Sequence, residues 1–436
     1  MILQKYESYK DSGVEWLGEI PEGWEVKRIK DICELNPMTS KKISVQEAES
    51  IEFLPMSQVD EIRGVIKKYL FEKYEDVKTG YTSFKNEDIL FAKITPCMEN
   101  GNCVIVKGLK KNLGFGSTEF IIFRANSKYQ RFLYLFLRNK RFLEKAEFFM
   151  TGSAGQKRIS TSYLEVHPIC IPTKHEQIQI SDFLDTKTSQ IDSKIKVLQD
   201  KITCYEELKK TLINETVCRG LNKDVGLKDT EIEWIEKIPK HWRIDRNKNL
   251  FYESKKVSKT GKEDLLSVSE YTGVTIKGKD EETGENNSRA DSLEEYKICS
   301  KGDLVINIML AWKTGLGVSP FFGIVSPAYG VYSPKSKISP EYYHYLFRTD
   351  MYTAEFRRSS TGIISSRLRL YSDKFFAIHS ILPPKPEQIQ IAKYLDEKTS
   401  KIDKIISKID EQVNTLTEFR KTLINDVVTG KVRVST

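Results

Sequence analysis

The stretch "EQIQISDFLDTKTSQID" at residues 176–192 returns as "EQIQIAKYLDEKTSKID" at residues 387–403. Over the longer segments 176–214 and 387–425, 19 of 39 aligned positions are identical. So dense a match at a fixed offset indicates an internal duplication. The chain is therefore expected to consist of two related halves.

A second repeat precedes each copy of the first. "DSGVEWLGEIPEGWEVKR" (11–28) aligns without gaps on "DTEIEWIEKIPKHWRIDR" (229–246). Between the two repeats, "EDILFAKITP" (87–96) matches "GDLVINIMLA" (302–311) faintly but in order. These short β-branched and aromatic runs predict strands, and segments with apolar residues at helical spacing follow them. Each half therefore predicts a small α+β domain ahead of the repeated phrase.

The repeated phrase has a heptad period, which predicts a long helix in each half. Apolar residues and one Thr step by four and three and, after a skip, reach Leu208 and Leu212. The same positions recur 211 residues later, where the skip leads to Phe419 and Leu423. An ordinary amphipathic helix on its own domain is the alternative. We instead expect the two helices to bury each other's seam, with these residues at its centre: Ile191, Ile195, Leu198, Ile402, Ile406 and Ile409.

Two equivalent halves that pair through equivalent helices favour two-fold symmetry, which makes the helices antiparallel. The predicted fold class is thus α+β, with two similar heads separated by an antiparallel coiled coil. The expected domains are a first head at 1–174, a first helix and linker at 175–224, a second head at 225–385, and a second helix and tail at 386–436.

Composition limits the function classes. The 436 residues carry 69 Lys+Arg against 61 Asp+Glu, a net charge of +8 that permits DNA binding without demonstrating it. No apolar run approaches the ~20 residues that cross a bilayer, and the polar start does not resemble a signal peptide. Seven cysteines and five scattered histidines form no metal-ligand spacing. We expect a cytoplasmic chain without metal, cofactor or membrane contact.

Four short motifs resemble pieces of catalytic sites, and each departs from its pattern. "GVTIKGKD" (273–280) has Asp280 where a phosphate-binding loop needs Ser or Thr, and "GFGSTE" (114–119) breaks the dinucleotide pattern at its last position. "NPMT" (36–39) lacks the aromatic residue that stacks on a flipped base, and "DVK" (76–78) has no partner acid nearby. The sequence therefore predicts no catalytic site.

Taken together, the ordered segments resemble the specificity subunit of type I restriction-modification systems. The likeness covers essentially the whole chain and includes P-x-x-E-Q-x-x-I-x-x-x-L-D ahead of the second helix, together with these segments of the first half: "GVEWLGEIPEGWEVKRIKDI", "FLPMSQV" (53–59), "DILFAKITPCMENG" (88–101), "GFGSTEFIIFR" (114–124) and "TGSAGQKRIS" (151–160). The second half departs from this pattern, because "TGIISSRLRL" (361–370) lacks the Gly-x-Lys-Arg spacing.

The resemblance implies a function and a set of partners. Two target recognition domains would each read one half of a split site in double-stranded DNA. The helices would set the gap and dock two methyltransferase (modification) subunits, which supply S-adenosylmethionine and methylate adenine. Restriction subunits with an ATP-driven motor would bind through those subunits. The chain itself would be non-catalytic.

Candidate DNA contacts are chosen by residue type. Gly152 and Gly155 let the backbone of the first head approach a phosphate, and Gln and Arg can bond two base-edge atoms at once. Each residue could equally be a solvated loop charge. The first cluster contains Lys93, Thr95, Gln156, Lys157, Arg158, Ser160 and Thr161. The second contains Lys313, Ser365, Ser366, Arg367 and Arg369.

A second function class remains open at this stage. A duplicated coiled-coil adaptor whose heads bind other proteins would fit the mild basicity equally well. Lys and Arg gathered on one face would favour DNA, whereas an even spread would favour the adaptor.

Overall fold

The computed structural model describes residues 2–38, 50–153, 155–278, 292–364 and 367–435. It divides into two compact units: unit 1 contains residues 1–199 and 410–436, and unit 2 contains residues 200–409. Both long helices are shared, since each contributes one part to unit 1 and the other part to unit 2. Each unit is therefore a head together with one antiparallel helix pair.

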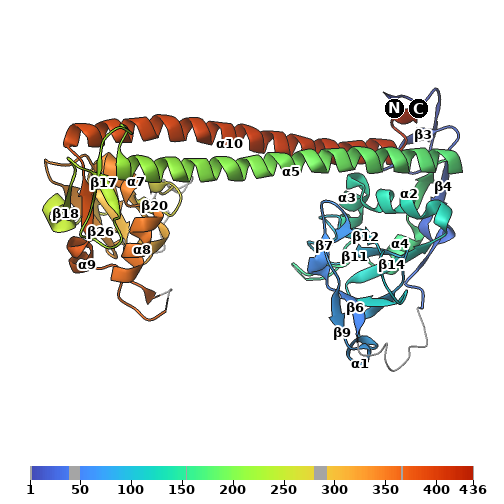
Figure 1. Ribbon diagram of the computed structural model, residues 1–436. Helices are drawn as coiled ribbons and strands as arrows, with labels where there is room; N and C mark the ends of the chain where they lie inside the picture. Colours follow the sequence, from blue (N-terminus) through green and yellow to red (C-terminus); the bar gives the residue numbers. More distant parts are fainter. Residues whose placement is uncertain (1, 39–49, 154, 279–291, 365–366, 436) are drawn as a thin grey trace. The chain divides into compact units, whose positions relative to one another are not determined.

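A four-stranded antiparallel sheet forms the centre of unit 1. Its buried apolar residues, such as Phe91 and Phe123, stand opposite buried apolar residues of the neighbouring strand. Its order is β12 (Cys103–Ile105), β11 (Ile89–Ala92), β14 (Phe120–Ala125) and β5 (Cys33–Leu35). Helix α2 (Ser127–Leu137) covers this sheet, and Figure 1 shows it beneath the N-terminal part of α5 (Lys174–Arg219).

The remaining elements of unit 1 extend this centre. A second sheet has the order β10 (Thr82–Phe84), β13 (Gly114–Gly116), β6 (Ile51–Leu54) and β9 (Leu70–Glu72). Three antiparallel strand pairs are β2 (Tyr9–Asp11) with β3 (Glu19–Pro21), β4 (Glu25–Arg28) with β15 (Pro168–Ile171), and β7 (Val59–Asp60) with β8 (Val65–Ile66). The short helices are α1 (Tyr74–Val77), α3 (Lys140–Phe148) and α4 (Thr161–Val166). The N-terminal β1 (Ile2–Gln4) pairs with the C-terminal β28 (Arg433–Ser435).

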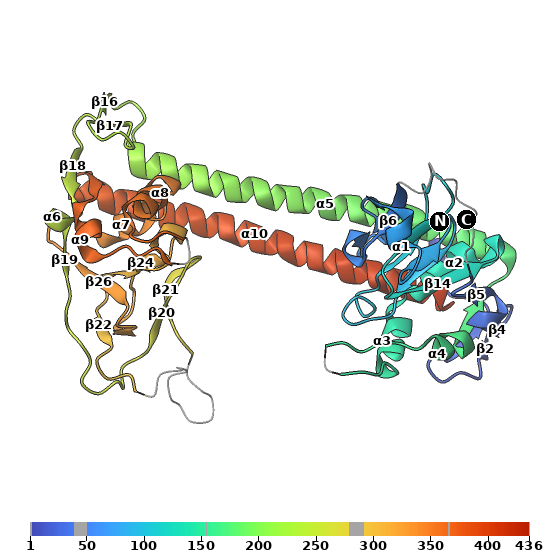
Figure 2. The ribbon, with the colours of Figure 1, turned by 90° about the horizontal axis from the view of Figure 1, so that it is seen from below.

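Unit 2 repeats the central sheet in the same order. It contains β24 (Leu316–Val318), β23 (Leu304–Asn307), β26 (Tyr329–Pro334) and β19 (Phe251–Glu253), all antiparallel. Two further pairs repeat those of unit 1: β16 (Leu227–Asp229) with β17 (Lys237–Pro239), and β18 (Arg243–Arg246) with β27 (His379–Leu382). Figure 2 shows α7 (Pro340–Leu346) and α8 (Asp350–Ser359) beside this sheet. Unit 2 also contains α6 (Asn247–Leu250), α9 (Ser372–Ala377), β20 (Leu266–Ser269), β21 (Gly273–Ile276), β22 (Lys297–Cys299) and β25 (Gly323–Val325).

The predicted long helices are confirmed as α5 and α10 (Lys385–Val428), and they pack antiparallel within each unit. In unit 1, Ile191 and Ile195 share a core with Leu423 near the opposite end of α10. The prediction is wrong at the skip in the heptad, because Leu208 and Phe419 are each 53% exposed. A straight α-helix has 3.6 residues per turn, whereas the heptad repeat assumes 3.5. A residue that follows a skip in the repeat therefore no longer faces the partner helix.

Contacts confirm the duplication in finer detail than the alignment does. Arg420 Nε on α10 pairs with Asp192 on α5 at 2.9 Å in unit 1, and at the two equivalent positions, each offset by 211 residues, Lys209 Nζ on α5 pairs with Asp403 on α10 at 2.7 Å in unit 2. The indole of Trp242 likewise donates to Glu387 at 2.9 Å, as Trp24 does to Glu176 at 3.5 Å. Equivalent positions in the two halves therefore make equivalent contacts, while the heads between them differ.

Within the described part of the chain, no helix is long and apolar enough to cross a membrane. The same residues contain no group of three or more His, Cys, Asp or Glu side chains placed to hold a metal ion. All seven cysteines are free thiols.

Candidate DNA interface

In the first head, the structure brings the predicted loop against the end of the central sheet. Thr151 and Arg158 exchange backbone hydrogen bonds of 3.0 and 2.8 Å and so close the loop. Thr95 N donates to Lys157 O at 3.1 Å, and Ile159 N donates to Lys93 O at 3.0 Å. The backbones of Lys93 and Thr95, which follow strand β11, therefore lie beside the loop, and their contact with DNA stays a prediction.

The second head builds an equivalent loop despite its different sequence. Thr361 and Arg369 exchange two backbone bonds of 2.9 Å, and Leu370 N donates to Ile308 O at 2.9 Å. This loop is one residue longer, and its Gly362 has φ +141° where Gly152 of the first head has φ +135°. A Cβ on either glycine would come within 2.7 Å of a carbonyl oxygen of the returning strand, so both positions require glycine. The structural counterpart of Arg158 is thus Arg369.

Arg158 is paired with Glu119, a residue that the sequence analysis did not select. Its Nε and Nη2 donate to the carboxylate at 3.0 and 2.9 Å, and Nη1 donates to Gln156 O at 3.2 Å. This pairing, with Lys93 nearby, lowers the pKa of the Glu119 carboxyl. A guanidinium has five N–H donors, so two remain, one on each Nη. Those two could meet a base edge or a phosphate while Glu119 fixes the orientation of the group.

The other first-head candidates have mixed surroundings. Gln156 and Lys157 are exposed at the loop, and Lys157 N donates to Thr95 Oγ1 at 3.2 Å. Ser160 Oγ accepts from Tyr163 N at 3.2 Å and so caps helix α4. Thr161 Oγ1 accepts from the Asn36 side chain at 3.4 Å. Ser160 and Thr161 therefore have local structural partners that explain them without DNA.

In the second head, Lys313 lies at the end of η4 (Ala311–Lys313), after strand β23. Its Nζ lies 5.0 Å from the ring centroid of Trp312, and the guanidinium carbon of Arg357 lies 5.4 Å from the same ring. Arg367 is exposed, and Arg369 Nη1 donates to Leu368 O at 2.9 Å. Ser365 and Ser366 lie outside the described residues.

Three residues beside the loops were missed by sequence reasoning. Glu119 stands 39 positions before its partner Arg158, and Trp312 and Arg357 are separated by more than one element. Glu119 directly precedes strand β14, and the residue that directly precedes the equivalent strand β26 is Ala328. That acid is therefore a difference between the heads, as expected for surfaces that contact different ligands.

Comparison with known proteins bears on this geometry. Residues 21–202 match the family described as type I restriction modification DNA specificity domain. The type I restriction enzyme EcoAI specificity subunit of Escherichia coli is 36% identical over 198 residues, which are 45% of this chain and 33% of that relative. The chain thus spans about a third of the length of that curated relative. A putative type I restriction enzyme MjaX specificity subunit of Methanocaldococcus jannaschii is 24% identical over 100% of both chains.

A solved structure shares the fold over nearly the whole length. It concerns complex assembly and conformational transition of the type I R-M system, and it aligns over 94% of this chain and 98% of its own with a TM-score of 0.70 and 13% identity. Residues 21–202 are thus similar in sequence to the DNA specificity domain of type I restriction-modification systems, and nearly the whole chain shares the fold of this solved structure.

Proposed function

We propose that this chain is the DNA-reading specificity subunit of a type I restriction-modification complex. Residues 1–174 and 225–385 are the proposed target recognition domains, each reading one half of a bipartite site in double-stranded DNA. Helices α5 and α10 set the gap between the halves. Catalysis belongs to partner modification and restriction subunits, and the complex acts in the cytoplasm.

One observation carries this proposal. The two heads hold equivalent loops on equivalent sheets through the same backbone bonds, from Ile159 to Lys93 and from Leu370 to Ile308. The side chains on these loops differ between the heads. A conserved scaffold with divergent polar loops supports two readers of different sequences, because base-edge contacts specify sequence while the scaffold only positions them.

The proposed docking of modification subunits rests on exposed apolar residues that repeat. Ile178 and its counterpart Ile389, both in the "EQIQI" phrase, are each 51% exposed. The skipped heptad residues Leu208 and Phe419 repeat in the same way. Exposed apolar side chains at equivalent positions of both units support two equivalent binding surfaces.

A methylation map tests the function. The chain is co-expressed with the modification subunit of its own system in a host without other adenine methylation, and modified adenines are located by single-molecule sequencing. We expect a single motif of two short sequences with a fixed gap and one methylated adenine in each half. Replacing the residues of loop 361–370 with other residues should change the methylated sequence in one half of the motif and leave the sequence of the other half unchanged.

The adaptor alternative predicts a different result from the same experiment. Under that alternative, the modified motif would be absent or would not respond to changes in either loop. Scattered methylation that is unaffected by both loops would contradict the proposed function.

A further inference from the structure

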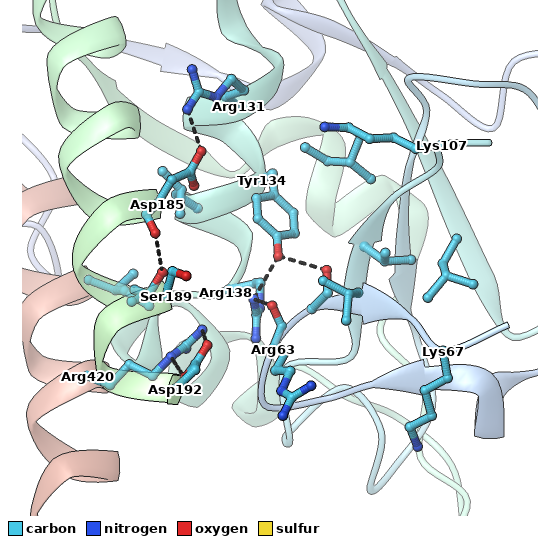
Figure 3. A pocket seen from close by; sticks show the side chains of 18 of the residues that line it. Arg63, Lys67, Lys107, Arg131, Tyr134, Arg138, Asp185, Ser189, Asp192 and Arg420 are labelled. Carbon is cyan, nitrogen blue, oxygen red and sulfur yellow. Dashed lines mark hydrogen bonds and ion pairs between the residues drawn. The ribbon is translucent and has the colours of Figure 1, made fainter. Parts of the chain in front are cut away.

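A groove of about 950 Å³ lies within unit 1, between the central sheet and the helix pair. Its walls come from the segment around hairpin β7–β8, from the end of β12, from α2, and from facing parts of α5 and α10. Figure 3 shows Arg420 of α10 reaching Asp192 of α5 on one side, with Lys67 and Lys107 on the other. Eight lining residues are Lys or Arg, whereas only Asp185 and Asp192 are acidic.

The cations at the floor of the groove are already paired. Arg131 donates to Asp182 and Asp185, and Arg420 donates to Asp192. Arg138 donates to three consecutive backbone carbonyls, of Glu61, Ile62 and Arg63, and to the Tyr134 hydroxyl. These bonds hold the hairpin segment against α2 and fix the shape of the groove.

The rim has unbalanced positive charge. In the described part of the chain, no carboxylate lies within 4.0 Å of the side-chain nitrogens of five exposed rim residues: Arg63, Lys67, Lys68, Lys107 and Lys196. Lys67 Nζ donates to the backbone carbonyl of Ser57 at 3.3 Å. Because both lining acids are used by Arg131 and Arg420, this rim attracts a polyanion.

Contacts connect the groove to the candidate DNA interface. The turn after Thr95 continues to Asn100, whose side-chain nitrogen donates to Glu61 at 3.0 Å. The backbone carbonyl of Glu61 also accepts a hydrogen bond from Arg138, which bonds the carbonyl of the rim residue Arg63 as well. A DNA duplex that contacts loop 151–158 would therefore also reach the rim of the groove. The wall of the groove opposite this hairpin segment is formed by α5, the helix that follows the first head in the sequence.

We propose that this groove binds the phosphate backbone of the DNA between the two half-sites, without reading its sequence. The inference rests on the proposed function and adds a phosphate-binding site outside the recognition loops. Contacts of Lys and Arg side chains to phosphates neutralise charge and carry no base information. An acidic protein segment would be the competing occupant, but the centre of the groove holds charged Arg138 and Arg420 where a helix in a groove needs an apolar stripe.

The test uses the full chain assembled with its modification subunits and the split target found by methylation mapping. In one variant Lys68, Lys107 and Lys196 are changed to Gln. The matched control is Lys194→Gln, an exposed lysine two residues from Lys196 on the same helix that does not line the groove. Affinity is measured at several salt concentrations, because each lost phosphate contact lowers the slope of log K against log[salt] by about 0.9.

We expect the triple variant to lose up to about 2.7 units of slope, while its preference for the target over scrambled halves and its assembly with modification subunits are unchanged. Neutral methylphosphonates are then placed singly along the DNA. Those in the gap should weaken binding by the wild type and have no further effect on the triple variant.

Three results would overturn the inference. The first is a triple variant with the same slope as Lys194→Gln. The second is methylphosphonate sensitivity confined to the half-sites, and the third is loss of a modification subunit without loss of DNA affinity. If the wild type itself shows no preference for the split target, the proposed function fails, and the slope on random duplex still decides whether the groove binds phosphates.

Discussion

At the scale of single residues, the pairing of Arg158 with Glu119 fixes the orientation of the Arg158 guanidinium in the first head. The carboxylate holds one side of the guanidinium, and the remaining donors point away from that bond. In the second head the position of Glu119 is Ala328, so Arg369 is held differently. Equivalent arginines with different neighbours can therefore have different preferences on similar backbones.

Arg158→Ala should weaken recognition of one half-site by about 1–3 kcal/mol if this residue contacts a base. Arg369→Ala should do the same for the other half-site, and Arg367→Ala tests its exposed neighbour in the same loop. Binding to targets with one scrambled half, measured at two salt concentrations, separates the two effects. Equal weakening on every sequence, with about one unit less salt slope, would instead assign Arg158 to a phosphate.

His167 makes the stability of unit 1 depend on pH. Burial, followed by the nearby charge of Lys145, lowers the pKa of this imidazole to about 4, and its buried Nε2 has no hydrogen-bond partner among the described residues. The unfolded chain binds a proton below about pH 6.5 and the folded chain does not. Stability should therefore fall as the pH drops from about 6.5 to 4, by up to about 3 kcal/mol from this group.

The measurement is the urea midpoint as a function of pH. His167→Phe should flatten the curve over this window, because the titrating group is removed. His175→Phe, at an exposed position on the same segment, is the control. A wild-type slope retained in His167→Phe would rule out this histidine as the cause.

At the scale of elements, the two cross-helix ion pairs occupy equivalent positions with unequal burial. The side chain of Arg420 is 8% exposed, whereas that of Lys209 is 32% exposed. Removing the partner of a buried charge leaves that charge uncompensated, whereas an exposed pair contributes little. The same bond should therefore be structural in unit 1 and nearly dispensable in unit 2.

Asp192→Asn should cost about 3 kcal/mol of stability, and Asp403→Asn less than about 1 kcal/mol. Chemical denaturation gives the change in the free energy of unfolding of each variant, and hydrogen exchange along α5 and α10 locates where stability is lost. Similar costs for both variants would show that burial does not distinguish the pairs.

The sequence predicted the elements whose pattern is local. The heptads in 176–214 and 387–425 predicted both long helices, and the repeat of 11–28 at 229–246 marked equivalent segments of the two halves, because periodicity and duplication can be read without tertiary contacts. Leu208 and Phe419 were misplaced because a skip in the heptad is resolved only by the actual twist of the helix. Glu119 and the rim residues Lys107 and Lys196 were missed because they meet only after folding.

At the scale of the whole molecule, the two proposed docking surfaces predict how many modification subunits bind to this chain. Native mass spectrometry should find one copy of this chain with two modification subunits. Either single change, Ile178→Asp or Ile389→Asp, should leave one bound modification subunit, and the double variant should bind none. The reason is that burying a charge in an apolar contact is costly. Val197→Asp, an exposed change at a position where the other half has Lys408, is the control. A double variant that still binds two subunits would place the docking surfaces elsewhere.

The ring of Trp312 lies near two cations in the second head, and this arrangement supplies an optical signal. Indole emission responds to nearby charge, so a DNA strand that draws Lys313 or Arg357 away from the ring would change the fluorescence of this residue. The first head has Cys97 at the matching turn, a half-buried free thiol. In a variant that keeps Trp312 as its one tryptophan and Cys97 as its one cysteine, tryptophan emission would report occupancy of the second half-site and a fluorophore attached through Cys97 would report the first. The order in which the two halves of a target are engaged then becomes directly observable in time.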